Sequence, residues 1–152
     1  MEAKLDQKDL EIIGCLKKNC KQSIYKIAKK TGLPPTTIHS RIKKLESNGV
    51  IKRYSVELDN EKMGKPLCVY TLINYDLHKW EKTWKPIEEL EKELFAIEGV
   101  AEIAYVTGQF DILLKMNLKD INELNNNILY KLKKITGVLH THTIIAIQHM
   151  ER

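Results

Sequence analysis

The sequence predicts an α+β protein made of an N-terminal winged helix-turn-helix and a C-terminal ferredoxin-like βαββαβ domain. Apolar residues recur every three to four positions in the first third of the chain, as in helices, whereas later segments alternate apolar and polar residues, as in strands. Charge also divides the chain: residues 1–56 hold 13 Lys and Arg against 5 Asp and Glu, and residues 57–152 hold 12 against 15. We therefore expect domains at 1–55 and 67–152, joined by a connecting strand at 56–66.

Composition is that of an ordinary globular protein. Of the 152 residues, 43% are hydrophobic and 30% are charged, and the net charge is +5. No apolar run approaches the roughly 20 residues of a membrane helix, and the acidic N-terminus lacks the pattern of a signal peptide. We expect a cytoplasmic protein with no membrane partner. The three cysteines form no CxxC pair, so neither a disulfide framework nor a thiolate metal site is expected.

Two helices are predicted in the first 32 residues. Asp6 is suited to cap the first helix, which ends near Asn19. Its apolar positions are Leu10, Ile12, Ile13 and Leu16. Ser23 is suited to cap a shorter helix that runs through Lys30 and is followed by a turn at Gly32. Its apolar positions are Ile24, Ile27 and Ala28.

The segment after Leu33 predicts a third helix with two different faces. Pro35 fits the first helical position, and Gly49 marks the end. The inward stripe consists of Ile38, Ile42 and Leu45. Arg41 lies nearer the apolar edge, where it is better placed to brace the helix than to contact bases. The opposite face and its flanks carry Thr36, Thr37, His39, Ser40, Lys43, Lys44 and Ser47.

A face of hydroxyl and basic side chains suits a DNA major groove. Thr and Ser can meet base edges and thymine methyl groups there, and Lys can meet phosphates. The stretch 50–59, VIKRYSVELD, alternates apolar and basic residues, as a wing of paired strands would. The predicted DNA-binding residues are Thr36, Thr37, His39, Ser40, Arg41, Lys43, Lys44, Lys52 and Arg53. The alternative is a small basic bundle that packs on another domain, but charge, helix caps and helix face together favour double-stranded DNA as the partner.

Residues 66–148 alternate strands with helices. Strands are predicted at 66–75, 100–107, 111–117 and 138–148. One intervening helix carries Trp84, Ile87, Leu90 and Leu94. The other, capped by Asp120, carries Ile121, Leu124, Ile128, Leu132 and Ile135. In a βαββαβ unit both helices cover one face of the sheet, so we expect a second copy of the chain to cover the other face.

In combination these motifs resemble the Lrp/AsnC, or feast/famine, transcription regulators, along essentially the whole chain. The motifs are LDQKDLEII, IAKKTGLPPTTIHSRIKKLESNGVIKRY, VTGQFDILL and GVLHTHT, in this order. The resemblance implies a transcriptional regulator that binds pseudo-palindromic operators as a homodimer, often assembled into tetramers or octamers. It also implies an amino-acid effector, bound near a Gly-x-x-Asp loop where neighbouring dimers meet.

Carried over to this chain, the effector-binding residues that the resemblance implies are Thr107, Gly108, Asp111, Thr141 and Thr143. Loop N–H groups near Gly108 suit a carboxylate, and Asp111 suits an ammonium group. The alternative is structural, with Gly108 in a tight turn that Asp111 caps. The chain departs from the family pattern at Pro34, where a capping Ser or Thr is usual. It departs again in a long connection at 76–86 that contains Trp80 and Trp84.

Two other functions stay open. Proteins similar to this family decarboxylate tetrapyrroles with His and Arg side chains, yet residues 57–152 contain a single Arg, Arg152. His140 and His142 are spaced to chelate a transition metal, with His149 further on, although no carboxylate or Cys follows at ligand spacing. No catalytic motif is visible. We therefore expect neither enzyme activity nor a cofactor.

Overall fold

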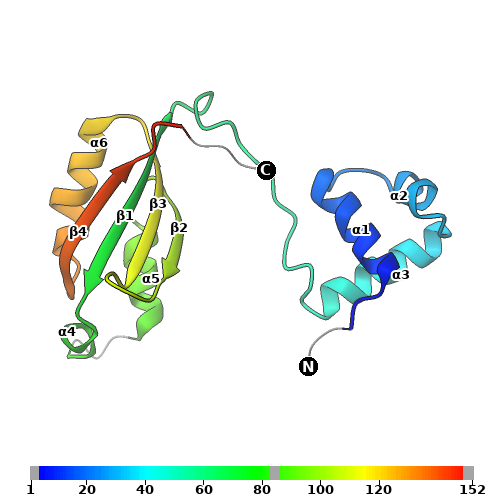
Figure 1. Ribbon diagram of the computed structural model, residues 1–152, viewed down its shortest axis with the longest axis horizontal. Helices are drawn as coiled ribbons and strands as arrows, with labels where there is room; N and C mark the ends of the chain where they lie inside the picture. The colour runs from blue at the N-terminus through cyan, green and yellow to red at the C-terminus, as the bar shows by residue number, and fades with distance from the viewer. Residues whose placement is uncertain (1–3, 83–85, 149–152) are drawn as a thin grey trace. The chain divides into compact units, whose positions relative to one another are not determined.

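The computed structural model describes residues 4–82 and 86–148 (Figure 1). The chain divides into two compact units, Met1–Glu57 and Leu58–Arg152, each with its own hydrophobic core. The division falls at the start of the connection predicted at 56–66. Residues 60–64 of that connection form a turn, closed by a hydrogen bond from the N–H of Met63 to the carbonyl of Asp59 at 3.0 Å.

Three helices form the first unit: α1 (Gln7–Lys18), α2 (Ile24–Thr31) and α3 (Pro35–Ser47). The predicted caps are present. The Asp6 carboxylate accepts from the N–H of Asp9 at 2.8 Å, and the Ser23 hydroxyl accepts from the N–H of Lys26 at 3.4 Å. Gly32 ends α2 with φ of 70°, a left-handed conformation that glycine adopts without strain. This tight turn joins α2 to α3 in a helix-turn-helix.

The core of the first unit consists of Ile12, Ile27, Ile38 and Leu45. Leu10, one of the apolar positions of the predicted helix, lies outside this core, because its side chain is 51% exposed. Two positions along a helix correspond to a rotation of about 200°. Leu10 therefore points away from the buried stripe, which is centred on Ile12 and flanked by Ile13 and Leu16.

No strand forms in residues 50–59, all of which the structure describes. Val50 and Ile51 pack against the helical core, and the residues after them have no regular structure. A strand needs a neighbour to pair its N–H and C=O groups, and the first unit offers no second strand within its described part. The predicted strand pair of the wing is therefore wrong for the single chain.

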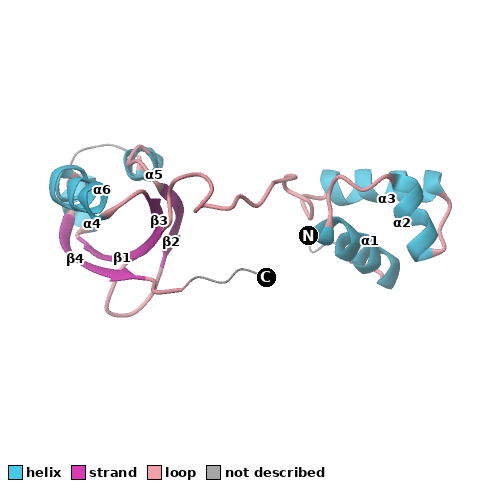
Figure 2. Ribbon diagram, turned by 90° about the horizontal axis from the view of Figure 1, so that it is seen from above, coloured by secondary structure: helices cyan, strands magenta, loops and turns pink. Residues whose placement is uncertain are grey.

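The second unit is a four-stranded antiparallel sheet in the order β2-β3-β1-β4. Its strands are β1 (Leu67–Tyr75), β2 (Val100–Tyr105), β3 (Ile112–Leu118) and β4 (Val138–Ile145). Its helices lie on one face of the sheet (Figure 2). This arrangement confirms the predicted α+β fold class and the βαββαβ order, although the last strand ends at Ile145 rather than at 148.

The helices of the second unit are less regular than predicted. They are α4 (Leu77–Glu81), α5 (Ile87–Phe95) and α6 (Ile121–Asn126), the last continued by a π-helical turn η1 (Asn127–Lys131) and a 3-10 turn η2 (Leu132–Lys134). No helix was predicted where α4 lies, in the 76–86 connection. Asp120 caps α6 as predicted, by accepting from the N–H of Glu123 at 2.9 Å.

The core of the second unit lies between the sheet and its helices. Its largest cluster is Ile73, Trp80, Leu90, Leu94, Ile97, Ile112, Leu114, Leu132 and Ile135. Trp80 is 2% exposed and packs in this core. Ile87 and Ile121, two apolar residues of the predicted helices, are 39% and 48% exposed and lie outside this core. Trp84, the tryptophan of the predicted helix, lies outside the described residues.

The opposite face of the sheet has no helix on it among the described residues (Figure 2). Strand pairing places Tyr70 opposite Ile144, and Leu72 between Leu113 and His142. Directly paired residues share a face, because side chains alternate along each strand. This surface, called the open face below, includes Tyr70, Leu72, Asn74, Glu102, Ala104, Leu113, Lys115, His140, His142 and Ile144.

Candidate DNA interface and effector site

The outward face of α3 carries the side chains that the sequence predicted there. Thr36, His39, Ser40, Lys43, Lys44 and Ser47 are exposed, and Thr37 is half-buried. Pro34 precedes the helix and provides no side-chain cap, and its carbonyl accepts from the N–H of Ile38 at 3.1 Å. The single acid of α3, Glu46, accepts a hydrogen bond from the Tyr54 hydroxyl at 2.8 Å.

Arg41 is held by two carboxylates of α1 and its cap. Its Nη1 lies 2.7 Å from Asp6 Oδ2 and 2.7 Å from Asp9 Oδ1. The N–H of Asp9 and the guanidinium of Arg41 lower the pKa of the Asp6 carboxyl, and the two carboxylates in turn raise the pKa of Arg41. Arg41 therefore braces α3 against the start of α1 through these ion pairs, in line with the role that the sequence suggested.

A polar hollow of about 500 Å³ lies between the start of α1 and the first turns of α3. Its lining consists of Lys4, Asp6, Asp9, Thr36, Thr37, Ser40, Arg41 and Lys44. Four of the predicted DNA-binding side chains of α3 line this hollow together with Arg41. Lys4, Asp6 and Asp9 also line it, although the sequence did not assign them to the interface. Periodicity describes each helix alone, so only the packing of α1 on α3 could place these three residues here.

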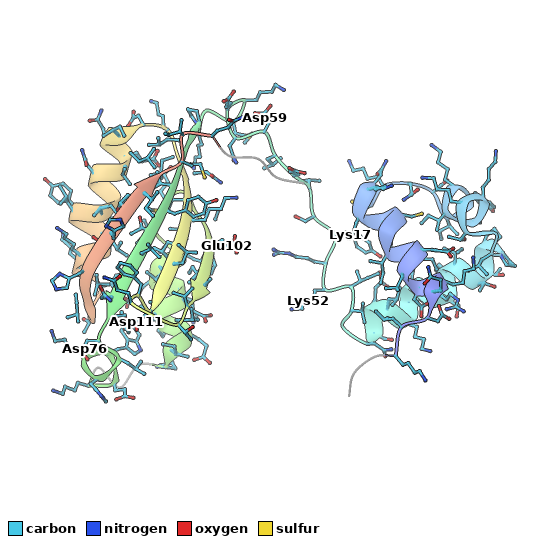
Figure 3. The ribbon with its side chains drawn as sticks, viewed as in Figure 1. Lys17, Lys52, Asp59, Asp76, Glu102 and Asp111 are labelled. Atoms are coloured by element: carbon cyan, nitrogen blue, oxygen red, sulfur yellow. The ribbon has the colours of Figure 1, made fainter. Side chains whose placement is uncertain are left out.

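A second hollow, of about 780 Å³, lies between the end of α1 and residues 50–57. Its cationic side chains are Lys17, Lys18, Lys21, Lys52 and Arg53; Lys17 and Lys52 are labelled in Figure 3. Burial, followed by the hydrogen bond to Glu46, raises the pKa of Tyr54 to about 12. The protonated Tyr54 hydroxyl thus ties this segment to α3, with Lys52 and Arg53 exposed beside it.

Asp111 lies at the end of a loop and is hydrogen-bonded to β1 through both its backbone and its side chain. Its N–H donates to the carbonyl of Ile73 at 2.9 Å, and its Oδ2 accepts from the N–H of Tyr75 at 2.7 Å. The amide of Asn74 donates to the carbonyl of Gln109. Gly108 has φ of 120°, a conformation that L side chains rarely adopt. Gly108 therefore has the conformation of the tight turn that was considered, whereas the Asp111 carboxylate binds the backbone of β1 rather than that turn.

A mostly apolar pocket of about 440 Å³ lies next to Asp111. Its walls are Tyr75, Leu77, Ile87, Leu90, Tyr105, Asp111 and Ile112. Figure 3 places the Asp111 label at the same end of the sheet as Asp76, the residue that precedes α4. Burial, with Glu93, Tyr105 and Asp76 nearby, raises the pKa of the Tyr75 phenol, whose buried hydroxyl has no hydrogen-bond partner within the described residues.

The predicted effector residues do not all meet at this pocket. Thr107 and Gly108 are exposed on the loop that leads to Asp111. Thr141 and Thr143 lie on β4, paired with Ile73 and Thr71, so β1 separates them from Asp111. The Thr143 hydroxyl lies 3.4 Å from the buried hydroxyl of Thr71.

The histidines of β4 lie on the open face. The His142 ring stacks on Phe110, with ring centroids 6.2 Å apart. Among residues 4–82 and 86–148, no group of three or more His, Cys, Asp or Glu is placed to hold a metal ion; His149 falls outside this range. No described helix is both long and apolar enough to cross a membrane.

Comparisons with known proteins match both units. A family model described as winged helix-turn-helix DNA-binding matches residues 5–52, and one described as Lrp/AsnC ligand binding domain matches residues 69–152. The chain is 34% identical to the HTH-type transcriptional regulator FL11 of Pyrococcus abyssi over 97% of this chain and 93% of that protein. It is 31% identical to the regulatory protein AsnC of Haemophilus influenzae over 95% of this chain and 93% of that protein.

Solved structures agree on the fold. The LrpC structure of B. subtilis superposes with a TM-score of 0.82 at 24% identity, covering 98% of this chain and 99% of LrpC. A transcriptional regulator in complex with L-Met, from Neisseria meningitidis, superposes with a TM-score of 0.87 at 21% identity, covering 98% of this chain and 94% of that chain. With both units matched in order, this chain belongs to the Lrp/AsnC family of DNA-binding transcriptional regulators.

Proposed function

We propose that this regulator binds two-fold-symmetric operators as a homodimer, with one α3 in each of two successive major grooves. The observation that carries the proposal is the outward face of α3, which presents hydroxyls and lysines, while the one acid of the helix, Glu46, is hydrogen-bonded to Tyr54. Thr36, Thr37 and Ser40 discriminate bases, and His39 contributes less. Phosphate contacts come from Lys43, Lys44, Lys52 and Arg53.

A selection of bound sequences from random duplex DNA, at two salt concentrations, tests this proposal. We expect a motif whose half-sites lie about one helical turn apart, roughly 34 Å. Ser40→Ala should change the preferred base at one position of each half-site. Lys43→Ala should weaken binding to every sequence and reduce the salt slope by about 0.9 for each phosphate that the variant no longer neutralises. Binding without any preferred sequence would overturn the proposal.

We further propose that an amino acid with an apolar side chain binds in the pocket beside Asp111 and regulates the protein. The L-Met complex of a structural neighbour supports an amino-acid effector, and the walls of Leu77, Ile87, Leu90 and Ile112 favour an apolar side chain. The backbone N–H of Tyr75 donates to one carboxylate oxygen of Asp111, so the other oxygen is the acceptor for an ammonium group. The Tyr75 hydroxyl offers a ligand a hydrogen bond that the described protein atoms do not supply.

Thermal unfolding followed by tryptophan fluorescence tests the effector, since both tryptophans lie in the second unit. At 100 times the dissociation constant, a bound ligand adds about 2.7 kcal/mol of stability. We expect methionine or leucine to stabilise the wild type and glutamate to leave it unchanged. Asp111→Asn should abolish the effect, whereas Glu102→Gln, a change of an exposed carboxylate on β2, should not. Equal stabilisation by all amino acids would contradict an apolar pocket.

The relatives described above are regulators, which supports a regulator rather than an enzyme. Neither the tetrapyrrole decarboxylase nor the metal-responsive regulator gains support from the comparisons. Within the described residues, the His142 ring stacks on Phe110 and belongs to no group of three or more metal-ligating side chains.

A further inference from the structure

The carboxylates of Asp6 and Asp9 form a closed network with Arg41. Asp6 Oδ1 accepts from the N–H of Asp9 at 2.8 Å, and Asp9 Oδ2 accepts from the N–H of Asp6 at 3.1 Å. The remaining oxygen of each carboxylate accepts from Arg41 Nη1 at 2.7 Å. All four carboxylate oxygens are thus engaged, two in the capping box of α1 and two by a side chain of α3.

This network lies beside the side chains proposed to contact bases. Arg41 follows Ser40 on α3, and both line the polar hollow together with Thr36 and Thr37. Asp9 is 14% exposed and Arg41 is 30% exposed, so the contact between them is partly shielded from solvent. The capping box fixes the backbone at the start of α1. The ion pairs of Arg41 with Asp6 and Asp9 connect this fixed start to the middle of α3.

Transfer of Arg41 to a DNA phosphate would break both ion pairs. It would also leave the carboxylates of Asp6 and Asp9 unpaired in a hollow that is to face a polyanion. Lys43 and Lys44, on the same helix, are exposed and reach phosphates without breaking these ion pairs. Charge therefore favours Arg41 staying with α1 when DNA binds.

We infer that Arg41 is a positioning residue, which acts through Asp6 and Asp9 to fix the orientation of α3, and does not itself contact DNA. This inference rests on the proposed operator binding. It removes Arg41 from the predicted set of DNA contacts, and it gives Asp6 and Asp9 a part in sequence recognition although both are acids. Without the network, the hydroxyls of α3 meet base edges in a shifted position, and discrimination between sequences falls.

The test measures dissociation constants of the full chain for its selected duplex and for a random duplex of equal length, over a series of salt concentrations. Arg41→Ala should bind the selected duplex about tenfold more weakly or worse, as a mismatched base pair would. Its salt slope should equal that of the wild type. Lys43→Ala is the matched control on the same helix, and its slope should fall by about 0.9 for each phosphate that it no longer neutralises.

The double variant Asp6→Asn with Asp9→Asn separates the two roles of Arg41, because both Asn side chains keep an oxygen acceptor for the capping box. Removal of two negative charges strengthens binding to any duplex, so the ratio of affinities for selected and random DNA is the deciding quantity. A positioning role predicts that this ratio falls, as in Arg41→Ala. If the ratio instead rises or stays constant, the freed Arg41 contacts DNA and the inference is wrong.

Arg41→Lys provides the conservative variant. Its ammonium can pair with one carboxylate, so the ratio should return part of the way to the wild-type value while the salt slope stays constant. Far-ultraviolet circular dichroism should show the same helix content in all variants, which separates positioning from simple unfolding. A lower salt slope for Arg41→Ala would overturn the inference and leave operator binding intact. A wild type without any preferred duplex would overturn the proposed function itself.

Discussion

Single residues decide where the chain can turn in the second unit. Gly99 has φ of 85°, and a Cβ atom there would lie 2.6 Å from the carbonyl oxygen of Asn117. The N–H of Asn117 donates to the carbonyl of Gly99 at 2.8 Å, so the two backbones cannot separate without breaking that bond. This close approach of Gly99 to β3 depends on the tertiary structure.

Gly99→Ala should destabilise the second unit by about 2–4 kcal/mol, from a strained backbone and a steric overlap together. Gly64→Ala is the matched control: φ is 74° there, but nothing lies within 4 Å of the added Cβ atom. We expect it to cost about 1 kcal/mol. Urea unfolding followed by tryptophan fluorescence measures both values. Equal destabilisation would show that conformation alone, without the approach to Asn117, accounts for the effect.

The Asp6 carboxyl should titrate below its ordinary pKa of about 3.9. A depressed pKa in the folded state means that this carboxylate adds stability above about pH 4, which is lost as the pH falls through the folded pKa. Carboxyl-carbon NMR measures the titration directly. In Arg41→Ala the pKa of Asp6 should rise but stay depressed, because the N–H of Asp9 is the larger cause.

Asp59 is the internal control for this titration. Its pKa is lowered by Lys62 and not by Arg41, so it should be the same in Arg41→Ala and in the wild type. An Asp6 pKa that does not respond to Arg41→Ala would mean that the ion pair does not persist in solution.

At the scale of elements, pairing between β1 and β4 brings two threonines together. Thr71 is fully buried, and its hydroxyl lies 3.4 Å from that of Thr143. A buried hydroxyl without a partner costs about 1–3 kcal/mol, whereas removal of both hydroxyls costs little. Thr143, which the family resemblance suggested as an effector residue, therefore has a structural partner within its own sheet.

Thr143→Val should lower the free energy of unfolding by about 1–3 kcal/mol, and Thr71→Val in addition should recover most of that decrease. A double-mutant cycle in urea measures the coupling between the two hydroxyls. Additive effects would show that the Thr71 hydroxyl has another partner. Thr141→Val, at the next position on the same face of β4, is the control, and should show no coupling to Thr71.

At the scale of the whole molecule, the open face needs a partner. Tyr70, Leu72, Leu113 and Ile144 give it apolar area, and Ile144 is 46% exposed in the single chain. A second copy placed against this face would bury these side chains and pair two DNA-binding units. Dimer formation through the open face stays a prediction, in line with the two-fold-symmetric operator proposed above.

Leu113→Glu should convert the dimer to a monomer, because a carboxylate on the open face would be buried without a partner. Light scattering should then report half the mass, and operator affinity should fall by about a hundredfold or more, because a monomer binds only one half-site. Ile121→Glu, on a helix of the same unit with a 48% exposed side chain, is the control and should remain dimeric. A Leu113→Glu variant that stays dimeric would place the interface elsewhere.

The sequence by itself determined the local features. Helix caps at Asp6, Ser23 and Asp120, the turn at Gly32 and the βαββαβ order of the second unit were predicted correctly, because each depends on neighbours a few residues away. The exposed face of α3 followed from helical periodicity in the same way. The failures have the opposite character. The 50–59 wing needed a second strand, and helical periodicity alone could not show that the apolar side chains of Leu10, Ile87 and Ile121 lie outside the cores.

Only the tertiary structure decided which distant residues meet. It joined Arg41 to Asp6 and Asp9, set Asp111 against Tyr75, and left β1 between Asp111 and the threonines of β4. Contacts of this kind span tens of residues, and their geometry depends on how helices and strands pack. The pattern within one segment determines which of its sides is apolar, but only the packed chain determines what that side meets.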